Sequence, residues 1–300
     1  MTRWATYGVL LSSLVLASCD STSFGDVEAE VVVEAYLVAA EPLGQVRVSQ
    51  TISIDEVYDP ETAALNDAEV RVSLLTESGD VEETYPFRLS GNPGVYVPLE
   101  QTVVEPLRRY RLEVRAGDAT EPVVSETTVP GLFEILEKSA DSLVYQGEEQ
   151  FEVRLTRSNY PGRQSIFVFS TESLDPIADN LTPLYREIIG EDEPIDPDDL
   201  ADYVVNESPP FNEGNYIPND DGTLTIQYPW IALAFYGPNR IIANALDDNL
   251  FDYLRSQSIQ QEPSTLSPGT IPNIIDRVEG GTGVFGSVAR TVTDIYVLIP

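Results

Sequence analysis

Cys19 is the only cysteine in the 300-residue chain, and it is the residue whose position points most directly to chemistry. It follows Leu16, Ala17 and Ser18 at the end of an apolar run that begins at Ala5. This run is shorter than the roughly 20 apolar residues that span a bilayer as a helix, so its length and flanks indicate a cleaved signal segment. Small residues admit the chain to a peptidase cleft, and a free thiol can carry a lipid. The pattern therefore predicts a lipid on Cys19 and cleavage just before it.

The stretch Leu16-Ala17-Ser18-Cys19 resembles the lipobox of bacterial lipoproteins. The resemblance implies a signal peptide over residues 1–18 and a lipidated tether over residues 19–26. Several acyl chains, each adding about 0.8 kcal/mol per buried methylene, would hold the protein on a membrane. The alternative is an ordinary signal peptide with an incidental cysteine.

The composition of the chain excludes most hydrolytic and redox chemistry. Histidine is absent, and no second thiol exists. Ser-His-Asp triads, cysteine nucleophiles that need a histidine, and zinc sites built on histidine or cysteine are therefore excluded. A glycoside hydrolase that uses paired carboxylates remains open, but 50 acidic residues make chance pairs unavoidable. We expect no enzyme, no catalytic residue, no metal and no cofactor.

The formal net charge of −33 limits the partners of the chain. Nucleic acid and anionic lipid headgroups both attract basic surfaces, so neither is expected to bind this acidic chain. Lys138 is the only lysine, and all other basic residues are arginines. Dense carboxylates with almost no lysine are typical of proteins from high-salt habitats, where salt screens the repulsion between them. A merely acidic extracellular protein is the alternative.

Apolar residues alternate with polar residues in the first half of the mature chain, which predicts strands with one buried face. Turn signals such as Gly91-Asn92-Pro93-Gly94 separate the strands. We expect an immunoglobulin-like β-sandwich over residues 27–130, with strands over 27–39, 46–48, 70–74, 84–89, 94–97, 110–114 and 123–129. A row of arginines at 108, 109, 111 and 115 is either a ligand patch or, more commonly, a solvated strand face paired with acids.

Residues 131–300 predict a second β-rich domain with one or two short helices. Strands are expected over 151–156, 165–170, 240–246, at 288 and over 295–299. Asp247 is expected to cap a helix that runs to about Gln260, with Leu250, Phe251 and Leu254 on its apolar face. Residues 174–222 break the pattern with 7 prolines, 14 acids and one arginine. We interpret them as an acidic surface insertion without an evident core, either a binding loop or disordered. Within it, Asp196 should cap a helix that runs to about Val205.

Four residues are candidates for binding. Tyr228 and Trp230 belong to an aromatic stretch, 228–236, which is either a platform for sugar rings or, more commonly, a buried strand. Asp198 and Asp202 are acids of the insertion that, with Glu191 and Asp192, fit a calcium site beside Asn219-Asp220-Asp221-Gly222. That last stretch is more simply a hairpin turn.

The order of sequence features along the chain resembles that of a known family. The lipobox, the alternating strands, Leu250-Phe251-Asp252-Tyr253-Leu254 and the run Gly280-Gly281-Thr282-Gly283-Val284-Phe285-Gly286 resemble the lipoprotein family named domain of unknown function 4249. The glycine–phenylalanine run is the most specific part, and we expect it to form a tight turn before closing strands.

The family resemblance implies a non-catalytic outer-membrane lipoprotein, on the periplasmic or cell-surface face. Its implied role is an accessory or ligand-binding partner of a TonB-dependent receptor. A structural or adhesive envelope protein is the alternative, and a carboxylate-pair glycoside hydrolase is the weakest one.

Overall fold

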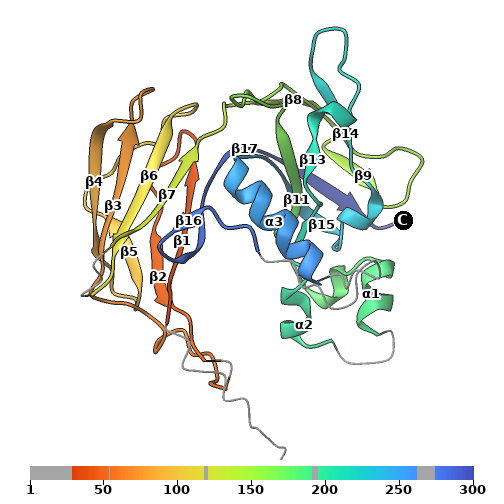
Figure 1. Cartoon of the computed structure of the whole chain (residues 1–300). Helices are drawn as coiled ribbons and strands as arrows, with labels where there is room; N and C mark the ends of the chain where they lie inside the picture. The colour runs from red at the N-terminus through yellow and green to blue at the C-terminus, as the bar shows by residue number, and fades with distance from the viewer. Residues whose placement is uncertain (1–28, 54, 118–120, 191–194, 262–273) are drawn as a thin grey trace, which may run out of the picture.

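The computed structural model describes residues 29–53, 55–117, 121–190, 195–261 and 274–300, and for residues 258–261 it describes the backbone alone. The described chain is mainly β, as predicted (Figure 1). Its strands form one large mixed sheet, in the order β12-β11-β15-β17-β1-β2-β5-β4-β3-β6-β7-β16, and a smaller sheet in the order β14-β10-β8.

The seven strands predicted in the first half are present. Alternation is clean in β1, where Val33, Ala35 and Leu37 are buried while Glu34 and Tyr36 face solvent. The valines, leucines and tyrosines of these strands meet in a shared core. The strands are β1 (Val31–Val38), β2 (Val46–Gln50), β3 (Glu69–Leu75), β4 (Val81–Leu89), β5 (Val95–Pro98), β6 (Arg109–Arg115) and β7 (Val123–Thr128).

The second half adds ten strands and three α-helices to the part of the chain that is described. The strands are β8 (Ile135–Lys138), β9 (Ser142–Val144), β10 (Glu152–Leu155), β11 (Ile166–Ser173), β12 (Val205–Glu207), β13 (Phe211–Asn212), β14 (Leu224–Gln227), β15 (Gly237–Leu246), β16 (Val278–Glu279) and β17 (Thr282–Leu298). The helices are α1 (Pro183–Ile189), α2 (Pro197–Ala201) and α3 (Asp248–Gln261). No helix among the described residues is both long and apolar enough to cross a membrane.

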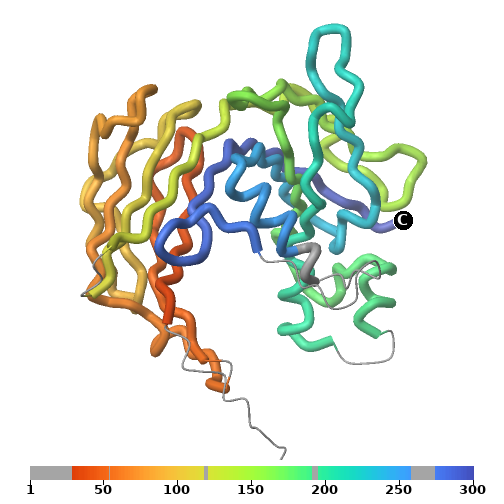
Figure 2. The backbone as a smooth tube through the Cα atoms, viewed as in Figure 1, coloured from red at the N-terminus to blue at the C-terminus, as the bar shows by residue number. Residues whose placement is uncertain are grey.

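Strand β17 joins the two halves of the chain. Its first part pairs in parallel with β1, from Thr282 to Val288, and its second part pairs antiparallel with β15, from Val288 to Val297. Figure 2 shows this C-terminal segment running beside the N-terminal strand before it enters the second half. Strand β17 therefore pairs with strands from both of the expected domains, residues 27–130 and 131–300, and the two halves share one sheet.

Two glycines of the C-terminal run allow this junction. At Gly283, φ is +119°, and a Cβ atom there would collide with the backbone of Val33 on β1. At Gly286, a Cβ atom would collide with the side chain of Leu250, which packs from α3 onto the sheet. Only Gly280 and Gly281 form the predicted turn, between β16 and β17, whereas Thr282 to Gly286 already belong to β17, where Gly283 and Gly286 permit close packing.

Residues 174–222 differ from the expectation in that they carry a core of their own. Leu181, Tyr185 and Leu200 are buried against Phe235, which is fully buried. Strands β12 and β13 also pair with β11. The expectation of a coreless insertion was wrong because its apolar residues are spaced irregularly between prolines and acids, so they show neither strand nor helix periodicity.

Two boundaries in this region also differ from the prediction. Asp196 caps α2 with a capping box, as expected, but the helix ends at Ala201 instead of near Val205. The aromatic stretch 228–236 is not a strand: it holds a short 3-10 helix, Trp230–Ala232, and irregular chain. Pro229 precedes that turn, and proline lacks the N–H group that a strand ladder needs.

We predict that Gly286→Ala lowers the free energy of unfolding by about 1–3 kcal/mol, because the added methyl overpacks the contact with buried Leu250. Chemical denaturation of the purified protein measures this change. Gly91→Ala is the matched control, since nothing lies within 4 Å of a Cβ atom there. Equal stability of the two variants would contradict the steric role of Gly286.

Candidate functional site

The structure separates the four residues predicted to bind. Tyr228 is buried and lines a cavity, whereas Trp230 is half-buried and stacks edge-on against Tyr145, with ring centroids 5.4 Å apart. Asp198 and Asp202 lie exposed on and just after α2, and neither lines that cavity. Only Tyr228 therefore belongs to a hollow that a ligand can enter.

The cavity that Tyr228 lines has a volume of about 380 Å³ and lies between β11, the β12–β13 connection and the chain that follows β14. This volume is in the range of pockets that hold small molecules or single side chains. The lining is mostly aromatic and aliphatic: Phe169, Tyr185, Asn206, Glu207, Ser208, Pro209, Phe211, Tyr216, Ile226, Gln227, Tyr228, Pro229, Ile231 and Ala232. Hereafter we call it the aromatic cavity.

Strand alternation and ring packing build the walls of the aromatic cavity. In β14, Ile226 points inward while Gln227 is exposed, and the chain then turns at Pro229. Tyr228 packs against Phe169 of β11 with ring centroids 5.9 Å apart. On the other wall, Phe211 of β13 packs against Tyr216 at 6.4 Å. Such edge-to-face pairs fix the rings in place.

Few polar groups of the aromatic cavity are free. The Tyr185 hydroxyl donates a hydrogen bond to the carbonyl of Ile231 at 2.7 Å. The Tyr228 hydroxyl is buried and has no hydrogen-bond partner among the described residues, and burial raises the pKa of this phenol. Glu207 is the only charged residue of the lining. The cavity thus offers apolar contact without a pair of carboxylates for acid–base chemistry.

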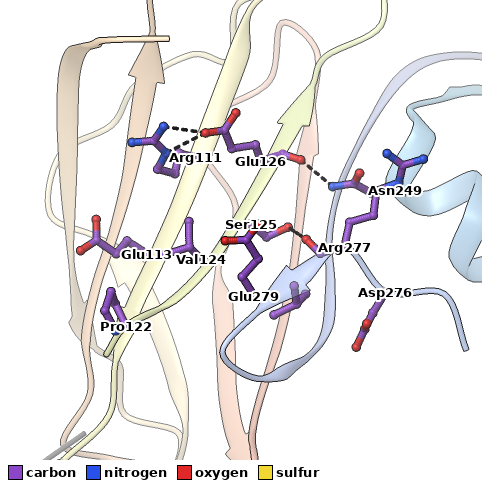
Figure 3. Close-up of a pocket in the computed structure, with 11 residues that line it drawn as sticks. Arg111, Glu113, Pro122, Val124, Ser125, Glu126, Asn249, Asp276, Arg277 and Glu279 are labelled. Atoms are coloured by element: carbon purple, nitrogen blue, oxygen red, sulfur yellow. Dashed lines mark hydrogen bonds and ion pairs between the residues drawn. The ribbon is translucent and has the colours of Figure 1, made fainter. Parts of the chain in front are cut away.

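A second hollow, of about 730 Å³, lies between strands β6 and β7 and the segment leading into β17 (Figure 3). Both of its arginines are engaged within the chain: Arg111 pairs with Glu126, and Arg277 pairs with Asp252 at 2.5 Å. Asn249 of α3 donates to the carbonyl of Glu126 at 2.7 Å. The Ser125 hydroxyl likewise donates to the Arg277 carbonyl at 2.7 Å. Because these two hydrogen bonds to carbonyls bridge the two halves, we interpret the hollow as a structural seam.

A buried carboxylate lies at this seam. Asp247 has no exposed surface; it accepts hydrogen bonds from the Thr127 hydroxyl at 2.5 Å and from the Leu250 amide at 2.9 Å. The Thr127 and Ser287 hydroxyls are 2.7 Å apart. Asp247 thus caps α3, as predicted, and also ties β7 and β17 to the helix. Burial raises its pKa to about 6.

The stretch proposed for calcium forms a turn. Asp221 accepts hydrogen bonds from the amide and hydroxyl of Thr223, at 3.0 and 2.6 Å, and pairs with Arg154 at 3.2 Å. No cluster of three or more potential metal ligands occurs among the described residues. Glu191 and Asp192 lie outside that part of the chain. The turn interpretation is the one that these contacts favour.

A family model matches residues 21–294, most of the chain. The chain belongs to the family described as domain of unknown function DUF4249. This DUF4249 protein has no significant match among functionally curated proteins. The family assignment confirms the resemblance noted in the sequence.

Similar solved structures include three of alpha-2-macroglobulin from Escherichia coli, in a trypsin-activated, a native and an elastase-activated form. Identities are 11%, 9% and 12%, with TM-scores of 0.22, 0.23 and 0.24. The DUF4249 chain is covered to 89%, 89% and 91%, and it spans only 15%, 14% and 23% of those chains. These TM-scores are too low to support any conclusion about this protein.

Sequence reasoning missed most of the walls of the aromatic cavity. Phe211 and Tyr216 lie in the acidic segment, where no periodicity marks them, and they reach the site through pairing of β13 with β11. Tyr185 sits on α1, a helix that was not expected. Aromatic residues are no denser in this segment than in the whole chain, so its composition gave no signal either.

We predict that Tyr228→Phe leaves the free energy of unfolding unchanged or slightly higher, because it removes a buried hydroxyl that has no partner. Tyr185→Phe is the matched comparison, and it should cost about 1 kcal/mol because a hydrogen bond is lost. Urea denaturation measures both. A clear loss of stability in Tyr228→Phe would show that a water molecule or another group satisfies the hydroxyl.

We predict a pH-dependent contribution of Asp247 to stability. Its folded pKa, about 6, is raised above the unmodified value of 3.8, so its stabilising contribution is complete below pH 3.8 and is lost as pH rises through 6. Across this window the loss is about 3 kcal/mol. Unfolding free energies of wild type and Asp247→Asn, measured between pH 4 and 7.5, test this. Parallel pH profiles would contradict the raised pKa.

Proposed function

We propose that this DUF4249 protein is a non-catalytic binding protein, anchored by a lipid on Cys19 to the outer membrane, where it accompanies a TonB-dependent receptor. The observation that carries the anchor is the stretch Leu16-Ala17-Ser18-Cys19, directly before the residues that match the family. Residues 1–28 lie outside the described residues, so this step rests on the sequence.

Binding, rather than catalysis, is supported by the chemistry of the aromatic cavity. Its one charged lining residue, Glu207, has no second carboxylate beside it in the lining, and histidine is absent from the whole chain. Paired carboxylates are the minimum for glycoside hydrolysis. Aromatic walls around a small volume are typical of a recognition pocket.

A structural or adhesive role is the second candidate, and one observation favours it. The continuous hydrogen bonding of β1, β17 and β15 makes the two halves a stiff unit, which suits a spacer. A spacer does not need an aromatic cavity, however, so we place binding first.

We predict that Cys19→Ser releases the protein from membranes, since Cys19 is the only thiol that can accept a lipid. Fractionation of cells that express the wild type or the variant, followed by immunoblotting of membrane and soluble fractions, measures this. Ser23→Thr, which leaves Leu16 to Cys19 unchanged, is a control for altered residues near the cleavage site. Full retention of Cys19→Ser in the membrane fraction would overturn the lipid anchor.

The association with a receptor is tested by co-purification. The wild-type lipoprotein is isolated under mild detergent from solubilised outer membranes, and a stoichiometric TonB-dependent receptor is expected alongside it. Its absence after chemical crosslinking in cells would overturn this part of the proposal.

A further inference from the structure

The mouth of the aromatic cavity is apolar as well as its interior. Ile231, a lining residue, has 60% of its surface exposed. Pro209 and Pro229 are exposed lining residues on either side. Apolar residues gathered at a cavity mark interaction sites. A small molecule inside would leave these mouth residues in water, so a larger occupant fits better.

The polar groups of the lining are largely occupied within the chain, which disfavours a sugar ring. Glu207 accepts from the Ser170 hydroxyl at 3.3 Å, the Gln227 amide donates to Glu152 at 3.3 Å, and the Ser208 hydroxyl donates to the Pro209 carbonyl at 3.0 Å. A sugar carries several hydroxyls, and burying them without partners costs free energy. The interior fits an apolar ring that makes few hydrogen bonds.

The negative charge of the segment that lines the aromatic cavity favours a positively charged partner. Residues 174–222, which provide much of the lining, contain 14 acids and a single arginine. The whole chain carries −33. A field of this sign attracts cationic segments, speeds their association and repels acidic ones.

From these three observations we propose that the aromatic cavity is the docking site for a positively charged segment of another protein, which inserts one aromatic side chain. The volume of about 380 Å³ accommodates such a ring, and the flanking chain of the partner covers the exposed lining residues Ile231, Pro209 and Pro229. A central aromatic anchor with a surrounding rim is the usual form of a binding hot spot. This proposal rests on the proposed binding function and names the kind of partner for that site.

The test uses the full mature lipoprotein in detergent and a blocked tripeptide with 4-fluorophenylalanine between two arginines, followed by ¹⁹F NMR. We expect saturable binding by this peptide. Binding should weaken at least about tenfold when the ring is replaced by alanine or when the arginines are replaced by glutamates. Methyl glucopyranoside, followed by saturation-transfer NMR, provides the sugar comparison.

A pair of protein variants locates the binding. Ile231→Arg places a positive charge at the mouth and removes apolar surface, so it should weaken peptide binding at least about tenfold. Val81→Arg introduces the same charge at a residue 52% exposed on β4 of the sandwich, and it should leave binding unchanged. Matching circular dichroism spectra confirm that both variants fold, and empty micelles report any binding to detergent.

The outcomes separate this inference from the receptor association. Equal binding of the aromatic and alanine peptides, equal effects of Ile231→Arg and Val81→Arg, or saturable binding of the sugar alone would overturn the docking site, whatever co-purifies. Peptide binding at the aromatic cavity without a co-purifying receptor supports the docking site and counts against the receptor as the partner.

Discussion

The close parallel pairing of β1 with β17 is the constraint on which the rest of the structure depends. It requires the backbones at Val33 and Gly283 to approach more closely than any side chain at position 283 permits. Because β1 opens the described chain and β17 closes it, the large sheet is complete only when segments about 250 residues apart in sequence have met. The same strand then pairs with β15, so the pairing of β1 with β17 also positions the sheet of the second half.

The hydrogen bonds around Asp247 fix the position of α3 relative to β7 and β17. Apolar packing alone tolerates small slides of one element over another, whereas a buried carboxylate must keep its hydrogen-bond partners. Thr127 on β7 and Ser287 on β17 lie beside Asp247 at the start of α3, and Asn249 donates to the Phe285 carbonyl at 2.7 Å. The polar contacts therefore hold the helix, the sandwich and the C-terminal strand in one relative arrangement, although neutralising the carboxylate would relieve its desolvation.

The sequence predicts those parts of the fold whose signals are local. The strands of the first half alternate because one face is buried, and Asp196 and Asp247 precede helices because a carboxylate satisfies free amides there. The aromatic cavity could not be predicted because its walls meet only through the pairing of β13 with β11. Tyr228 was identified from its aromatic surroundings alone, whereas the exposed acids Asp198 and Asp202 were chosen for a metal chemistry that their surroundings do not favour.

The path of β17 also connects the first described strand with the neighbourhood of the aromatic cavity. Thr282 pairs with Val32, near the start of β1. At the other end, the Leu298 carbonyl accepts a hydrogen bond from Tyr145, whose ring contacts Trp230 next to the cavity. Seventeen residues of strand lie between these ends, a path of roughly 55 Å along the strand. One continuous strand thus links the start of β1 to the neighbourhood of the aromatic cavity, so the pairing of β1 and the packing beside the cavity depend on the same element.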